Sequence, residues 1–349
     1  MTLAPTGIRA GKGESLRESI PTVSVIIVSW NVLEHLRRCL EALKESDVRS
    51  LEVIVVDNNS SDATREVIPR EFPQVRFISL GSNIGFPAAN NVALPHARGS
   101  FVLLLNPDTE VEPDCIRRCL EAFDRDPKIG MVGCRLVSPL GDVQYECACN
   151  MPSIVDAASE ALYLNVLLPR HRLFGRQRMS YWDHASDRYV PRICGAFMML
   201  RTDLLRDLHG LDERFFMYYE DLDLCARVGR EWEILYLASA TTVHHGGRSR
   251  AQSTRELEEL APAIRYTFYR DHRGKARAEL LRACLAVQSL FRLGIAVLMV
   301  ALVPRTSSWR STRAAQPTVH WNRLRWCLGL LGDVDGYELR GNAVGGESA

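Results

Sequence analysis

Apolar runs rich in β-branched residues alternate with helix-forming segments through the N-terminal third of the chain, and this alternation constrains the fold more than any other feature. Four such runs predict buried strands, at 23–28, 51–56, 75–80 and 101–105. The segment between the first two has leucines spaced for one face of a helix, and residues 85–97 also have a helical pattern. This rhythm is typical of parallel strands covered by helices on both faces, so we predict a doubly wound, Rossmann-like α/β domain.

Each of these strands is followed by residues that can form hydrogen bonds. They are Ser29, Trp30 and Asn31 after the first strand, Asp57 after the second, Asn83 after the third and 106–108 after the fourth. Each of them alone is explained by ordinary turn chemistry. Ligands of doubly wound sheets bind beyond the carboxyl ends of the strands, so the four polar strand ends together predict a binding site along one edge.

The tripeptide Asn106-Pro107-Asp108 directly follows an apolar strand. A carboxylate in that place can bind a hard cation, which in turn can neutralise a diphosphate. The alternative is a strand-terminating turn that contains proline, and the tripeptide alone favours this alternative.

A second cluster runs from Phe215 to Arg227, where aromatic residues lead directly into Glu220, Asp221 and Asp223 at the start of an amphipathic helix. A carboxylate at a helix N-terminus beside apolar walls can be both firmly held and basic. Such a group suits a general base acting on a sugar hydroxyl. Simple capping of the helix is the alternative, and we expect Asp223 to serve the helix.

The third cluster is His244-His245-Gly246-Gly247, just after a predicted strand at 231–237 and a turn. A lone histidine is more often structural than functional. The two glycines allow the backbone to pass close to a ligand, and an imidazole could complete a site begun by Asp108.

These segments together resemble the family 2 inverting glycosyltransferases of the GT-A fold, in the bacterial rhamnosyltransferase-like branch. The resemblance implies a doubly wound sheet in which the strands are mixed in direction. The matching pieces occur in the family's order: 25–31, 55–62, 83–86 with 90–91, 103–109, 195–198, 215–225, and His244 with Gly247 and Ser249. They extend from about residue 22 to residue 250, and their combination is far more specific than any one of them.

The resemblance implies a role for each matching residue. Those expected to bind the nucleotide sugar are Ser29, Trp30, Asn31, Asp57, Asn83, Gly85, Phe86, Asn106 and Gly195. Asp108 and His244 match residues that hold a divalent metal, Mg²⁺ or Mn²⁺, and Asp221 matches the catalytic base. The chain departs from the family pattern at Pro87, Ala93, 146–151 and Pro191-Arg192, near the expected sugar and acceptor region.

The function expected from the resemblance is transfer of a sugar from a nucleotide-diphospho donor, dTDP-rhamnose, to a lipid-linked or cell-envelope glycan. A sugar nucleotidyltransferase would share the α/β sheet and the metal, but it usually has a glycine-rich, basic loop after the first strand, where this chain has Ser29-Trp30-Asn31. A silent nucleotide- or glycan-binding module is the other alternative, although such a module usually loses the base or the metal ligand.

The charge of the chain is distributed unevenly. The net charge is +1, which gives no general case for nucleic-acid binding. Residues 265–325 hold 12 basic and 2 acidic side chains, a net charge of +10, while the remainder holds 31 basic and 40 acidic side chains, a net charge of −9. The ten cysteines form no metal-binding pairs and residues 1–20 lack an apolar run, so we expect reduced thiols and a cytoplasmic protein.

The basic tail contains an apolar stretch, 283–303, with Arg292 in its middle. Arg282, Gln288, Ser289 and Arg292 fall on one helical face, which predicts an interfacial helix on the cytoplasmic face of the plasma membrane, attracted to anionic lipid. A buried helix with a solvated basic face and a spanning helix are the alternatives. The expected organisation is a flexible leader (1–20), a GT-A domain (21–250) with an irregular acceptor-side insertion (150–190), a helical basic tail (251–330) and a disordered end (331–349).

Overall fold

The computed structural model describes residues 21–246, 255–302 and 317–330. Its centre is a sheet in the order β3-β2-β1-β4-β10-β6-β11-β5, with β8 paired beside β11. The sheet strands are β1 (Val23–Ser29), β2 (Leu51–Asp57), β3 (Arg76–Ser79), β4 (Phe101–Leu105), β5 (Thr109–Val111), β6 (Ile129–Val137), β8 (Arg188–Tyr189), β10 (Phe197–Arg201) and β11 (Glu233–His244).

The first half of the sheet is parallel, as the sequence predicts. β1 lies between β2 and β4, and Ser29 pairs with Asp57 at their carboxyl ends. The polar residues that follow these strands therefore meet along one edge.

The second half of the sheet contains both parallel and antiparallel strands, as the resemblance to the GT-A fold implies. β10 is antiparallel to both β4 and β6, and β5 is antiparallel to β11. A short β9 (Arg192–Ile193) precedes β10, and Gly195 lies between the two, outside both strands. The strand predicted at 231–237 continues through an irregularity in its pairing as far as His244. This extension carries the histidine to the edge where the site lies.

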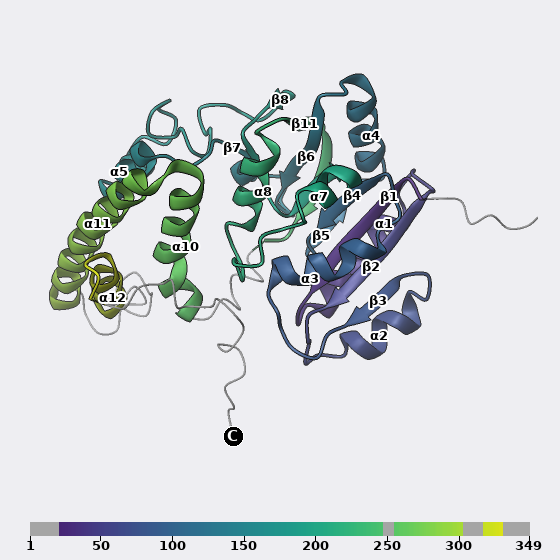
Figure 1. Cartoon of the computed structure of the whole chain (residues 1–349), viewed down its shortest axis with the longest axis horizontal. Coiled ribbons are helices and arrows are strands. Elements are labelled where there is room, and N and C mark those ends of the chain that lie inside the picture. The colour runs from purple at the N-terminus through teal and green to yellow at the C-terminus, as the bar shows by residue number, and fades with distance from the viewer. Residues whose placement is uncertain (1–20, 247–254, 303–316, 331–349) are drawn as a thin grey trace, which may run out of the picture.

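Helices cover both faces of the sheet (Figure 1). They are α1 (Leu33–Lys44), α2 (Thr64–Glu71), α3 (Phe86–Ala93), α4 (Cys115–Arg125), α7 (Thr202–Asp207) and α8 (Glu220–Val228). The helix predicted at 85–97 is α-helical only as far as Ala93. It then tightens into a 3₁₀ turn, η1 (Leu94–His96), because Pro95 lacks an N–H group to continue the α-helix. The doubly wound, mixed α/β fold class is confirmed.

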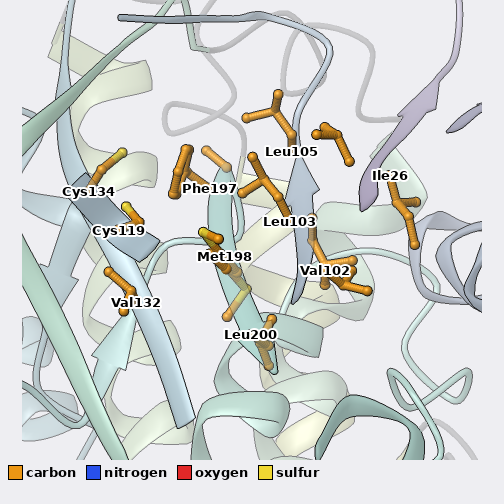
Figure 2. Packing of buried hydrophobic residues seen from close by; sticks show 14 of the residues in the cluster. Ile26, Val102, Leu103, Leu105, Cys119, Val132, Cys134, Phe197, Met198 and Leu200 are labelled. Carbon is orange, nitrogen blue, oxygen red and sulfur yellow. The ribbon is translucent and has the colours of Figure 1, made fainter. Parts of the chain in front are cut away.

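The core between the sheet and its helices is apolar. Figure 2 shows Leu103 of β4 between Ile26 of β1 on one side and Phe197 and Met198 of β10 on the other. All ten cysteines are unpaired, and eight are buried, as expected for reduced thiols used as small core residues.

The insertion and the tail form a helical group at the end of the molecule away from β1–β4 (Figure 1). The insertion begins after η2 (Tyr145–Cys147) and β7 (Ala148–Cys149), which pairs with β9, and contains α5 (Ile154–Ala161) and α6 (Leu164–Leu167). The tail provides α10 (Arg255–Arg273), α11 (Lys275–Leu302) and α12 (Pro317–Cys327). The predicted leader and C-terminal end lie outside the described residues.

Candidate active site

Asp57 ends β2 at the polar edge of the sheet, and its side chain is fully buried. Nε of Arg65 donates to Oδ2 of Asp57 at 2.7 Å, and the Ser60 N–H also donates to this carboxylate. These donors compensate the burial of the charge and fix the direction of the side chain.

The loop after β1 is tied to the loop after β2. Asn31 has a left-handed backbone (φ 54°), and its Oδ1 accepts a hydrogen bond of 2.7 Å from the Ser61 N–H. The Ser29 hydroxyl oxygen is buried and has no hydrogen-bond partner in the described part of the chain. Trp30 is partly exposed on the same loop. The loop is thus held in place by its own hydrogen bonds, and the Ser29 hydroxyl on it is available to a ligand.

The turn after β3 is built on Asn83 and Gly85. Oδ1 of Asn83 accepts hydrogen bonds from Nδ2 of Asn58 (2.9 Å) and from the Gly85 N–H (3.0 Å). Gly85 has φ 87°, and a Cβ there would lie 2.6 Å from the carbonyl oxygen of Phe216. The Phe86 N–H donates to that same carbonyl oxygen at 2.9 Å. The predicted nucleotide wall therefore packs directly on the segment that leads into α8.

Asp108 lies at the tip of the chain between β4 and β5 and is buried. Nε2 of His244 lies 3.5 Å from its Oδ1. Burial alone would raise the pKa of Asp108, but a protonated His244, the backbone N–H of Asp108 and His35 together hold that pKa below its ordinary value. Asn106 is held by its backbone, whose N–H donates to the carbonyl oxygen of Ala196 at 3.0 Å.

Gln144 determines which nitrogen of His244 faces Asp108. Nε2 of Gln144 donates to the backbone carbonyl oxygen of His244 at 2.7 Å, and Oε1 of Gln144 lies 2.7 Å from Nδ1 of the ring. Because Oε1 can only accept, Nδ1 must carry a proton, and the neutral ring then directs the lone pair of Nε2 at Asp108.

A cation fits this arrangement. In the neutral tautomer two electron pairs face each other across 3.5 Å, and Oδ1 of Asp108 accepts no hydrogen bond within the described residues. An imidazole nitrogen and a carboxylate oxygen are common ligands of one divalent ion. No group of three or more His, Cys, Asp and Glu side chains is placed to hold a metal in the ranges that the structure describes. Further ligands would have to come from substrate or water; Gly247 and Ser249 lie outside the described residues.

His245 is directed elsewhere. Its Nε2 lies 2.7 Å from Oε1 of Glu110, and its N–H donates to the backbone carbonyl oxygen of Asp108. The structure thus places His244, and not His245, beside the carboxylate of Asp108.

Asp221 lies in the first turn of α8, after two tyrosines with left-handed backbones, Tyr218 (φ 71°) and Tyr219 (φ 72°). Its Oδ2 accepts hydrogen bonds from Arg192 (3.1 Å) and from the Gly195 N–H (3.4 Å). Two consecutive non-glycine residues in this backbone region are strained, and such strain is common where a side chain has to be aimed. Gly195 thus lies against Asp221, since a Cβ on Gly195 would be 3.2 Å from that of Asp221.

Glu220 and Asp223 differ from Asp221 in their surroundings. Burial raises the pKa of Glu220 to about 8, and the Asp221 carboxylate adds to the rise. Oε2 of Glu220 is buried without a hydrogen-bond partner among the described residues, so Glu220 is protonated at neutral pH. Asp223 forms ion pairs of 2.7 Å with Arg227 and with His272 of α10, the structural role expected for it.

One backbone path connects the two carboxylates of the site. The Gly195 N–H binds Asp221, and the next residue, Ala196, accepts the hydrogen bond from Asn106, two residues before Asp108. The residues that sequence reasoning missed are Gln144, Arg192 and Phe216. Only Arg192 left a signal, as a departure from the family pattern.

A doubly wound mixed sheet with two carboxylates at one edge is the arrangement expected for a glycosyltransferase of the GT-A class. Residues 24–208 match the glycosyl transferase family 2 domain, and the chain belongs to this family. The N-acetylglucosaminyl-diphospho-decaprenol L-rhamnosyltransferase of Mycobacterium tuberculosis is 31% identical over 281 residues, which cover 76% of this chain and 91% of that protein.

Two solved structures share the fold. The mannosyltransferase PcManGT from Pyrobaculum calidifontis, in complex with GDP-Man and Mn²⁺, has a TM-score of 0.51 at 20% identity and covers 90% of this chain and 88% of its own. S. aureus TarS in complex with UDP-GlcNAc has a TM-score of 0.52 at 17% identity and covers 88% of this chain and 81% of its own.

Proposed function

We propose that this glycosyltransferase moves L-rhamnose from dTDP-rhamnose to a polyprenyl-linked or cell-envelope glycan, with inversion at the anomeric carbon. The observation that carries the proposal is Asp221, whose carboxylate is aimed by Arg192 and Gly195 and is connected through Ala196 to the edge that carries Asp108. The name of the mycobacterial relative, a rhamnosyltransferase that acts on a decaprenol-linked sugar, supports this donor and acceptor.

The chemistry follows from the two carboxylates. Asp221 would accept the proton of an acceptor hydroxyl as that oxygen attacks the anomeric carbon. Arg192 and the Gly195 N–H bind one oxygen of Asp221, Oδ2, and so orient the carboxylate. Glu220, protonated at neutral pH, adds no second negative charge beside the base. The donor would lie along Ser29, Trp30, Asn31, Asp57 and the 83–86 turn.

Asp108 and His244 would hold a divalent cation, Mg²⁺ or Mn²⁺, which supplies positive charge for the departing diphosphate. Support comes from the facing Oδ1 and Nε2 atoms and from the Mn²⁺ of the mannosyltransferase that shares the fold. Gln144 keeps the His244 ring in the tautomer that ligation requires.

The tail would bind the cytoplasmic face of an anionic membrane peripherally. One described helix, Lys275–Leu298, is long and apolar enough to cross a bilayer by length and composition alone. α11, however, packs with α5, α10 and α12. Gln288 and Ser289 are buried in these contacts together with Leu281 and Leu285, which supports an interfacial helix over one whose polar face is solvated.

The outer face of α11 is apolar instead. The exposed side chains on this face recur every three, four or seven residues: Leu280, Val287, Phe291, Ile295, Leu298 and Leu302. We name these six residues the α11 stripe. A packed helix whose outer face is apolar suits contact with lipid.

A panel of nucleotide sugars tests the donor and the function together. We expect dTDP-rhamnose with Mn²⁺ or Mg²⁺ to raise the melting temperature most and to be turned over when an acceptor is present. Release of pyrophosphate from a sugar phosphate and a nucleoside triphosphate would indicate a nucleotidyltransferase. Donor binding without turnover on any acceptor would indicate a silent binding module.

A further inference from the structure

The insertion carries an exposed apolar surface of its own. After α5 comes the segment 162–173, which includes α6 and has most of its side chains exposed to solvent. Its exposed large apolar residues are Leu162, Val166, Leu167, Leu168 and Leu173, and Leu167 is 71% exposed. We name these five residues the insertion surface. Leucines gathered in this way on a short surface segment indicate a contact with another apolar phase.

The insertion surface adjoins the α11 stripe. The ring of Tyr163, which directly precedes α6, lies 6.3 Å from the ring of Phe291, and the guanidinium of Arg292 lies 5.2 Å from the Tyr163 ring. Arg265 of α10 forms an ion pair of 2.8 Å with Glu160 at the end of α5. These contacts hold the insertion and the tail together, so the two exposed apolar sets belong to neighbouring elements.

Charge identifies what would cover the insertion surface. Arg170, His171 and Arg172 are exposed between Leu168 and Leu173, and residues 161–182 contain no aspartate or glutamate. The neighbouring tail has a net charge of +10 over 265–325. A bilayer surface with anionic headgroups accepts apolar and cationic side chains from one segment, whereas a second copy of this chain would place these cations against equal cations.

We propose that the insertion surface is a second lipid-contacting element, which binds an anionic bilayer beside the α11 stripe. The inference rests on the proposed peripheral association and adds to it a segment outside the tail. Ala157 of α5, Leu281 of α11 and Leu222 of α8 share one buried cluster. α8, the helix that carries Asp221, therefore packs against α5 and α11, which lie beside the two lipid-contacting surfaces. This packing would position the base relative to an acceptor embedded in the membrane.

The test is flotation of the full chain with vesicles of phosphatidylcholine and phosphatidylglycerol. The double variant Leu167→Asp with Leu168→Asp should bind at least tenfold more weakly than wild type. Leu140→Asp is the matched control, because Leu140 is 89% exposed in a turn outside both surfaces, and it should bind as wild type. Vesicles of phosphatidylcholine alone should bind wild type more weakly, since the arginines then lack anionic partners.

Other outcomes separate the two proposals. If the double variant floats as wild type while Phe291→Asp does not, the insertion surface is wrong and the tail anchor stands. If wild type itself does not float, both are wrong. A wild-type dimer that the double variant converts to a monomer, with unchanged flotation, would make this face a contact between copies. Unchanged melting temperature and donor binding in the double variant confirm that it is folded.

Discussion

Two helices of this chain, α4 and α11, differ in the polarity of the face that they expose. α4 packs Ile116, Cys119 and Phe123 into the sheet and leaves Arg117 and Glu121 in solvent, as a helix surrounded by water does. α11 buries Gln288 and Ser289 and exposes a row of large apolar side chains. The outer face of α4 therefore suits water, whereas an apolar medium would stabilise the side chains on the outer face of α11.

The largest expected effect is on turnover by the catalytic domain, whose helices, like α4, have polar outer faces. Asp221→Asn should lower turnover by something on the order of 10²–10⁴-fold and leave donor affinity nearly intact, because the lost interaction is proton transfer from the acceptor. Glu220→Gln is the matched control and should retain most of the activity. A large loss at Glu220 with Asp221→Asn near wild type would reverse the assignment of the base.

The next effect concerns the nucleotide and its cation. Asp108→Ala should abolish metal-dependent donor binding in calorimetry while the fold survives, since the residue lies in a chain between two strands rather than in the apolar core. Gln144→Leu should lower the affinity for the divalent metal by about 10–100-fold, because it frees the His244 ring to adopt the other tautomer. Undiminished metal-dependent binding by Asp108→Ala would remove this residue from the site.

The membrane side predicts a smaller effect. Val287→Asp with Phe291→Asp should lower vesicle binding by about tenfold or more, since two apolar contacts are replaced by charges that anionic lipid repels. Deleting 265–303 is a poor test, because Phe268, Tyr269 and Leu281 of that segment form a buried cluster with Leu222 of α8. Wild type should be extracted from membranes by high salt or carbonate, whereas resistance to both would indicate a spanning helix.

Gly85 tests the rigidity of the nucleotide wall. Gly85→Ala should lower the free energy of unfolding by about 1–3 kcal/mol, because alanine is strained at φ 87° and its Cβ would meet the Phe216 carbonyl oxygen. Gly81→Ala is the control, with no atom within 4 Å of the added Cβ, and should change stability little. Urea denaturation measures both. Equal stability of the two variants would show that the turn is not constrained.

The smallest effect is the pH dependence contributed by Glu220. Its pKa is about 8 in the folded chain, above the ordinary value of 4.5, so the folded state binds the proton more tightly. Its contribution to stability is therefore complete below about pH 4.5 and is lost as the pH rises through 8. Wild type should lose melting temperature relative to Glu220→Gln between pH 5 and pH 8. A constant difference across that range would contradict the raised pKa.

The sequence predicted the strand-end residues because each follows its own strand directly, and parallel strands bring their carboxyl ends to one edge. Arg192 and Gln144 could not be assigned in this way. Arg192 reaches Asp221 across 29 positions, and Gln144 reaches His244 across 100. The packing of β9 against α8 brings Arg192 to Asp221, and the extension of β11 brings His244 to Gln144.

The orientation of α11 shows a second limit of prediction from the sequence. Helical periodicity separates the polar face from the apolar face, but it does not say which face contacts the rest of the protein. The sequence therefore left interfacial, buried and spanning helices open. The burial of Gln288 and Ser289 in the packing with α5, α10 and α12 favours an interfacial helix over one with a solvated polar face.

The stereochemistry of the product tests whether this chain acts by direct displacement on an acceptor in the membrane. The full chain is incubated with dTDP-rhamnose, a divalent metal and vesicles that contain a polyprenyl-diphospho-N-acetylglucosamine, and the glycolipid is examined by NMR. The account predicts a rhamnosylated lipid whose anomeric configuration is inverted relative to the donor, and no such product from Asp221→Asn. A product with retained configuration would contradict a single displacement with Asp221 as the base.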